Sequence, residues 1–232
     1  MSAYENGRFT QDPPRYARDV CINLQARSGA QSGGLKLAAS HAPAYFDLVP
    51  WSTSFVSSAT QVVLEGSAND APGLIPGYYV PYIAYGSIAS TAAAHIAPVL
   101  LDNIPEQSPP YRFIFTGGQS GCSLLLLRSA TVGCVAAFHY PNSDGKAKGY
   151  PLLAQVGRSA SDILLAIDYA CYGDEQNVNG ASFFWHNGTE WVGVTQSQVM
   201  GAPDLRWGRH SMSINASRGA ILISKKAIGR IT

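Results

Sequence analysis

Residues able to carry out thiol chemistry lie close together near the middle of the chain. Cys122 ends the glycine-rich run that begins at Thr116, and His139 ends the second of two apolar segments that follow. A thiol becomes a strong nucleophile when a nearby imidazole takes its proton. Ser120 and Gly121 form a turn before the cysteine, and the backbone N–H groups at Gly121 and Cys122 are suited to bind an oxyanion. The pattern predicts a catalytic Cys122–His139 pair.

The spacing of the two residues predicts how they meet. The apolar runs 123–128 and 132–138 suit two buried strands joined by a short loop. A loop centred on Ala130 and Thr131 places Cys122 directly across from His139. Cross-strand neighbours have Cβ atoms roughly 4.5–5.5 Å apart, which allows a sulfur–imidazole contact. Thr116 lies across the glycine turn, and its carbonyl or hydroxyl is expected to orient the imidazole.

These residues resemble a known group of enzymes. The pattern Thr-x-x-x-Ser-Gly-Cys, followed by a histidine at the end of the next strand, is similar to the toxin deamidases of the cytotoxic necrotizing factor and Burkholderia lethal factor group. The cysteine-to-histidine spacing, with Pro141 just after the histidine, also resembles the chemoreceptor glutamine deamidase CheD. The resemblance implies Cys122 as nucleophile, His139 as base and Thr116 as orienting residue. It covers about residues 113–141, and Gln119 stands where the toxins usually have leucine.

The resemblance implies a function and a setting. The expected enzyme is a bacterial toxin or effector that deamidates a specific glutamine of a host protein to glutamate, with Rho-family GTPases or a translation-initiation RNA helicase as the family precedents for the substrate. It would act in the host cytosol as a monomer without a cofactor. The alternative setting is the bacterial cytoplasm, with a chemoreceptor substrate.

Other functions remain open from the sequence. The same cysteine–histidine pair would serve a transglutaminase or a cysteine protease. A non-catalytic β-sandwich module that binds a protein or a sugar is the alternative from another class, because a lone cysteine is most often a small buried apolar residue. The aromatic pair Trp185 and Trp191 would suit such a module.

Composition excludes several classes. The net charge is +1 and the basic residues do not cluster, so nucleic acid is not an expected partner. No apolar run is long enough for a membrane span, and residues 1–8 lack the apolar segment of a conventional signal peptide. If the protein is secreted, it therefore uses another route. The four cysteines are widely and irregularly spaced, which predicts neither a disulfide framework nor a metal site.

The rest of the pattern predicts one α+β domain over residues 1–232, with a β-sandwich core of mostly antiparallel strands and a few peripheral helices. Residues 1–18 are polar and are expected to be loosely ordered. Ser159 and Asp162 resemble a helix capping box, so a helix over 163–171 is favoured over a strand at 163–167. Asn187-Gly188 predicts a hairpin between the flanking apolar runs. Further strands are expected at 19–24, 35–39, 44–49, 61–65, 78–85, 211–214 and 220–224, with a helical turn at 89–96.

Overall fold

The computed structural model describes residues 2–24, 44–50, 61–67, 69–81, 100–141, 146–173, 179–200, 214–225 and 228–230. The strand expected at 35–39 and the helical turn expected at 89–96 lie outside these residues. Within them the chain is strand-rich with several short helices, so the α+β class is confirmed.

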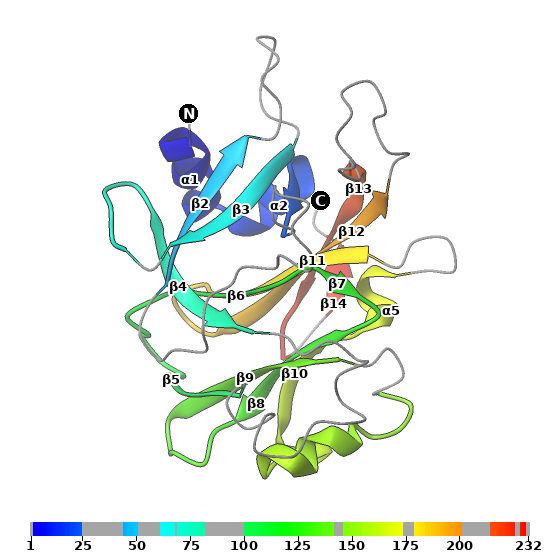
Figure 1. Ribbon diagram of the computed structural model, residues 1–232. Coiled ribbons are helices and arrows are strands. Elements are labelled where there is room, and N and C mark those ends of the chain that lie inside the picture. Colours follow the sequence, from blue (N-terminus) through cyan, green and yellow to red (C-terminus); the bar gives the residue numbers. More distant parts are fainter. Residues whose placement is uncertain are drawn as a thin grey trace.

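The larger of two sheets curls across the upper part of the molecule (Figure 1). Two of its strand pairs, β1–β3 and β4–β6, are parallel and the other pairs are antiparallel. It is therefore a mixed sheet. In spatial order its strands are β1 (Cys21–Asn23), β3 (Gln61–Ser67), β2 (Ala44–Pro50), β4 (Ile75–Val80), β6 (Phe113–Thr116), β11 (Asn179–His186), β12 (Trp191–Met200), β13 (Ile214–Ile223) and β14 (Ile228–Arg230), and β7 (Gln119–Ser120) also pairs with β11.

The smaller sheet is antiparallel and lies below the larger one in Figure 1. Its order is β10 (Ile163–Ile167), β8 (Ser123–Arg128), β9 (Cys134–Tyr140) and β5 (Leu101–Pro105). The chain passes from the larger sheet into the smaller one between β7 and β8. Cys122 therefore lies where the two sheets meet.

Residues 1–18 are helical where the structure describes them, so the expectation of loose order is wrong. Helix α1 covers Ser2–Gln11 and α2 covers Pro13–Asp19. Asp12 caps α2 by accepting a hydrogen bond from the amide of Arg15 at 3.1 Å. Tertiary contacts hold α1: the Asn6 side chain donates to Asp47 Oδ1 at 2.8 Å and accepts from the Leu48 amide at 2.8 Å. A local sequence pattern does not reveal such contacts.

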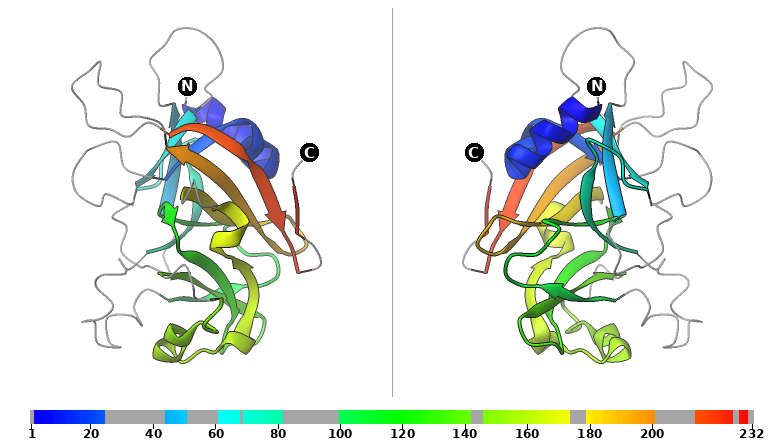
Figure 2. Two further views of the ribbon diagram at one scale, coloured as in Figure 1. Left: turned by 90° about the vertical axis from the view of Figure 1, so that its right-hand side faces the viewer. Right: turned by 90° about the vertical axis from the view of Figure 1, so that its left-hand side faces the viewer.

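Three apolar cores lie between the packed layers of the molecule. One face of the larger sheet packs on α1 and α2, which lie inside its curl (Figure 2). The opposite face packs on the smaller sheet through a core that includes Leu124, Leu126 and Phe184. A third core, with Leu125 and Leu127, lies between the outer face of the smaller sheet and the 3-10 helix η2 (Pro151–Val156). The β8–β9 hairpin thus has one face between the sheets and one face beneath η2.

Among the described residues, one edge of β1 has no neighbouring strand in the sheet, and side chains of β12 form hydrogen bonds with it instead. Gln196 of β12 accepts from the Ile22 amide at 2.9 Å and donates to the Val20 carbonyl at 2.7 Å. Gln198 donates to the Ile22 carbonyl at 2.6 Å. The curl of the larger sheet brings these glutamines to β1 and satisfies backbone groups that a sheet edge would leave open.

The helix predicted over 163–171 is wrong, and the strand alternative is correct. The capping box of Ser159 and Asp162 is present, but it caps the single turn of the 3-10 helix η3 (Ala160–Asp162). Residues 163–167 then pair with β8 as β10, where their apolar side chains are covered by both neighbouring layers. A four-residue helix, α5 (Tyr169–Tyr172), follows.

The hairpin predicted around Asn187-Gly188 is confirmed. His186 pairs with Trp191, so the connection has four residues and its centre lies one residue beyond the predicted one. Asn187 Oδ1 accepts the amides of Thr189 and Glu190 at 2.9 and 3.0 Å, and Gly188 adopts a positive φ of 101°. These contacts explain why the asparagine–glycine pair marks the turn.

Candidate active site

The β8–β9 hairpin forms as predicted, but its register differs. Leu124 pairs with His139, so Cys122 is not directly across from the histidine and that prediction is wrong. The cause is the loop. Ser129 and Cys134 close it, and Gly133 takes a left-handed φ of 76° that suits glycine. The centre of the loop therefore moves by one residue and the register moves by two.

Cys122 lies just before β8. The same register carried back past Ser123 would make His139 a diagonal neighbour of Cys122, and diagonal neighbours lie roughly 7–8 Å apart with their Cβ atoms somewhat closer. Within the described part of the chain, the hydrogen bond that lowers the pKa of the Cys122 thiol comes from the backbone of Ser120. The structure therefore brings the two residues to the same region of the hairpin, in a diagonal arrangement and not in the directly opposed one that the sequence predicted.

Thr116 and His139 do meet, across the space between the two sheets. The Thr116 hydroxyl lies 2.6 Å from His139 Nδ1 and donates to the Val80 carbonyl at 2.7 Å. A hydroxyl has one hydrogen, and a carbonyl can only accept. Nδ1 therefore carries the ring proton, and Nε2 carries the lone pair that a general base needs. The hydroxyl of Thr116, and not its carbonyl, orients the imidazole.

Burial sets the protonation states of His139 and Cys122. His139 is 1% exposed, and burial lowers the pKa of its imidazole from 6.5 to about 4. Burial also raises the pKa of the Cys122 thiol, more than the Ser120 backbone lowers it. At neutral pH the two groups are a thiol and a neutral imidazole. A thiolate held by an imidazolium is not the resting state that these pKa shifts favour.

The turn before Cys122 has a backbone conformation that favours glycine. Gly121 adopts a positive φ of 86°, which glycine tolerates without strain. Ser120 is exposed, so its contribution near the site is made by its backbone. The carbonyl of Cys122 accepts a hydrogen bond of 2.6 Å from the hydroxyl of Tyr172, a residue of α5 that the sequence analysis did not connect with this site.

A second group of polar residues near Cys122 was also missed. Asp168 is buried, and its Oδ1 accepts hydrogen bonds from the hydroxyls of Ser123, at 3.1 Å, and Tyr150. Lys146 Nζ lies 3.6 Å from Asp168 Oδ2. The sequence offered one signal for this residue: Asp168 is a lone acid directly after the apolar run that forms β10.

Gln119, the residue that departs from the toxin motif, is also buried. It is 1% exposed, and its Oε1 accepts from the hydroxyl of Ser182, which in turn contacts Thr195 Oγ1 at 2.8 Å. Its Nε2 has no hydrogen-bond partner among the residues that the structure describes. The position therefore holds a polar side chain by a specific bond to the neighbouring strand β11.

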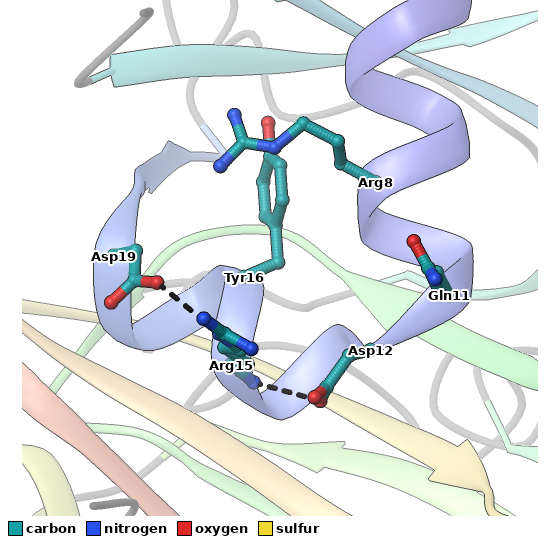
Figure 3. Close-up of a pocket in the computed structure, with 6 residues that line it drawn as sticks. All are labelled: Arg8, Gln11, Asp12, Arg15, Tyr16 and Asp19. Atoms are coloured by element: carbon teal, nitrogen blue, oxygen red, sulfur yellow. Dashed lines mark hydrogen bonds and ion pairs between the residues drawn. The ribbon is translucent and has the colours of Figure 1, made fainter.

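A hollow elsewhere on the surface does not belong to this group. It measures about 490 Å³ and lies between α1 and α2, on the helix-covered side of the larger sheet (Figure 3). Its charges bind one another: Arg15 lies 3.9 Å from Asp19, and Arg8 lies 3.2 Å from Glu5. Because these charges already have partners, we interpret the hollow as a gap left where α1 packs beside α2.

The described residues contain neither a metal-binding cluster nor a membrane-spanning helix. Among them, no three histidine, cysteine, aspartate or glutamate side chains gather as a group able to hold a metal ion. No helix in the described part of the chain is long and apolar enough to cross a membrane. All four cysteines are free thiols.

Comparisons with models of known protein families and with curated proteins gave no match. The site must therefore be interpreted from its own residues.

Proposed function

We propose that the protein is a cysteine-dependent deamidase that converts a glutamine of a protein substrate to glutamate. The observation that carries this proposal is the buried Thr116–His139 pair, which fixes the histidine tautomer beside the turn that bears Cys122. A histidine with a pKa of about 4 is unprotonated at neutral pH, so its Nε2 is a proton acceptor, and the substrate complex must raise its basicity for it to act as the general base.

The proposed reaction begins with attack of Cys122 Sγ on the carboxamide carbon. A sulfur–carbon bond forms, His139 Nε2 takes the thiol proton, and the carbonyl oxygen becomes an oxyanion held by the N–H groups of Gly121 and Cys122. His139 then gives the proton to the leaving nitrogen, and ammonia departs as the carbonyl re-forms in a thioester. Water, deprotonated by His139, hydrolyses the thioester and restores the thiol.

Proton transfer and attack are coupled in this proposal. Since burial disfavours both the thiolate and the imidazolium, the neutral pair must transfer the proton as the substrate arrives. A rotation of the Cys122 side chain, or a small movement of the turn, would close its separation from His139. Such tightening in the substrate complex is common for catalytic hydrogen bonds.

The biological setting follows from the resemblance to the toxin deamidases. We propose a bacterial toxin or effector that acts as a monomer in the host cytosol. Rho-family GTPases and a translation-initiation RNA helicase are the first substrates to test. For the fold, we interpret the two packed sheets as a variant of a β-sandwich in which the larger sheet is mixed and curled.

Mass spectrometry of treated host-cell lysate tests the proposal. Lysate is incubated with the wild-type protein, with Cys122→Ser, or with Cys134→Ser as a control cysteine on the same hairpin. We expect glutamine-to-glutamate conversion at one site with the wild type and the control, and none with Cys122→Ser. A chemoreceptor-containing bacterial membrane fraction is treated in the same way to test the alternative setting.

The other products separate the rival functions. Peptide cleavage or crosslinks that depend on Cys122 would replace the deamidase by a protease or a transglutaminase. The absence of any Cys122-dependent product in either sample would overturn the enzyme proposal in favour of a binding module, in which a half-buried thiol of raised pKa is an ordinary packing residue.

A further inference from the structure

Tyr172 contacts the backbone of the proposed nucleophile. It is the last residue of α5, it is 3% exposed, and its hydroxyl donates to the Cys122 carbonyl at 2.6 Å. In Figure 1, α5 lies beside β7, the strand that ends two residues before Cys122. No feature of the sequence connects residue 172 with residue 122.

Backbone groups of Gly121 and Cys122 also act on this hydroxyl. Burial raises the pKa of Tyr172, whereas hydrogen bonds from the backbone of Gly121 and of Cys122 lower it. A backbone group that lowers the pKa of a phenol does so by donating its N–H to the oxygen.

The tyrosine ring is held in place by close packing. A Cβ at Gly180 of β11 would lie 2.5 Å from Tyr172 Cδ2, so the ring occupies space that only glycine leaves open. The Tyr169 ring contacts it edge-on, with centroids 5.6 Å apart. The start of α5 is fixed by the bond between Asp168 and Ser123, the residue after the nucleophile. The position of the hydroxyl is therefore built into the fold.

We propose that the Tyr172 hydroxyl occupies the position of the substrate carbonyl oxygen and that a substrate must displace it to react with Cys122. This inference rests on the proposed function for the identity of the substrate carbonyl. It makes Tyr172 an autoinhibitory residue. A carboxamide reacts only when its own contacts move the hydroxyl from the amides of Gly121 and Cys122, which favours a protein substrate over a free amide.

A small aldehyde tests this position without requiring deamidation. Propanal has the carbon skeleton of the end of a glutamine side chain. Its carbonyl carbon forms a bond with Cys122 Sγ as the carbon–oxygen π bond breaks, and the thiol proton passes to the oxygen. The adduct is reversible and protects Cys122 from iodoacetamide. Intact-protein and peptide mass spectrometry would measure the alkylation rate of Cys122 against propanal concentration, with Cys134 of the same chain as internal reference.

The matched variants are Tyr172→Phe, which keeps the ring and removes the oxygen, and Tyr169→Phe, which makes the same change on the neighbouring ring. We expect Tyr172→Phe to lower the half-protecting propanal concentration about three- to tenfold, because no hydroxyl then competes for the amides. Tyr169→Phe should match the wild type. Alkylation without propanal should change less than about threefold, because it needs no oxyanion site.

Gly180→Ala provides a second route, because the added methyl must push the Tyr172 ring aside while the hydroxyl is kept. It should also strengthen protection by propanal. Circular dichroism would verify that each variant is folded. Equal protection in the wild type and Tyr172→Phe, or weaker protection in Tyr172→Phe, would overturn the inference, as would a lack of Cys122 protection in every form. Failure of deamidation in lysate with the expected propanal result would overturn the proposed function alone.

Discussion

Two buried polar groups lie on opposite faces of the β8–β9 hairpin, and they are bonded in different ways. On the face between the sheets, the Thr116 hydroxyl lies 2.6 Å from His139 Nδ1. On the face beneath η2, the Asp168 carboxylate accepts from Ser123 and Tyr150 and pairs with Lys146. The first group contains His139, a neutral side chain whose pKa is lowered by burial. The second contains Asp168, an acid among several hydrogen-bond donors.

The difference separates residues suited to chemistry from residues suited to positioning. A buried imidazole is neutral at neutral pH, so one ring nitrogen can accept a proton once the substrate complex has raised its basicity. A carboxylate surrounded by donors is stabilised where it is and ties three segments of the chain together. We therefore expect substitutions at the first group to change activity and substitutions at the second to change stability.

The largest effect is expected from His139→Asn. The asparagine amide can still donate to the Thr116 hydroxyl, but the base is lost. Deamidation should fall at least about 100-fold, while the free energy of unfolding changes by no more than about 1 kcal/mol. Rates by mass spectrometry and urea unfolding would check this. A variant with near-normal activity would show that His139 is not the base.

Asp168→Ala should have the largest effect on stability. The substitution leaves the buried hydroxyls of Ser123 and Tyr150 without an acceptor, which is expected to cost about 3 kcal/mol of unfolding free energy. Lys146→Met is the matched control, because Lys146 is largely exposed and should change stability by no more than about 0.5 kcal/mol. Equal urea midpoints for the two variants would contradict the positioning role.

The pH dependence of stability reports directly on His139. Its pKa is about 4 in the folded protein and 6.5 as the ordinary value, so between these pH values only the unfolded chain binds the proton. Stability from this group is therefore complete above pH 6.5 and falls as the pH drops to 4, by about 3 kcal/mol in total. His139→Asn should lack this component. Urea unfolding of both proteins at several pH values would measure it, and parallel curves would contradict the lowered pKa.

The smallest effect is expected at Thr116. Thr116→Val removes the hydroxyl that contacts His139 and Val80, which should cost about 1–2 kcal/mol of stability and lower activity about tenfold. Thr116→Ser keeps the hydroxyl and should stay close to the wild type in activity. If the valine and serine variants had the same activity, orientation of His139 by Thr116 would be excluded.

Local patterns predicted the strands and hairpins well, because alternating or continuous apolar residues report burial directly. The strands β2, β3, β8 and β9 lie where such runs are found. Helix α1 was missed because Glu5 and Asn6 are buried polar residues, and the pattern around them resembles an exposed loop. The helix predicted over 163–171 failed because its apolar spacing also fits a strand covered on both faces.

The site was predictable in part, since Thr116 meets His139 as the spacing suggested. The register of Cys122 was not, because it depends on the backbone conformation of Gly133 at the far end of the hairpin. Asp168 and Tyr172 were not predicted because their contacts with Ser123 and Cys122 span 45 and 50 residues. Contacts of that separation leave no periodic signal in the sequence.

The glutamine bonds at the edge of β1 have a consequence for how the chain is made. The backbone of Ala17, Val20 and Ile22 is bonded by Gln196 and Gln198, at separations of 174 to 179 residues. During synthesis the N-terminal segment leaves the ribosome long before these partners exist. Its final hydrogen bonds form only after β12 has emerged, and contacts of such long separation make folding slow. Ala17, Val20 and Ile22 are therefore translated well before β12 but are among the last residues to reach their native hydrogen bonds.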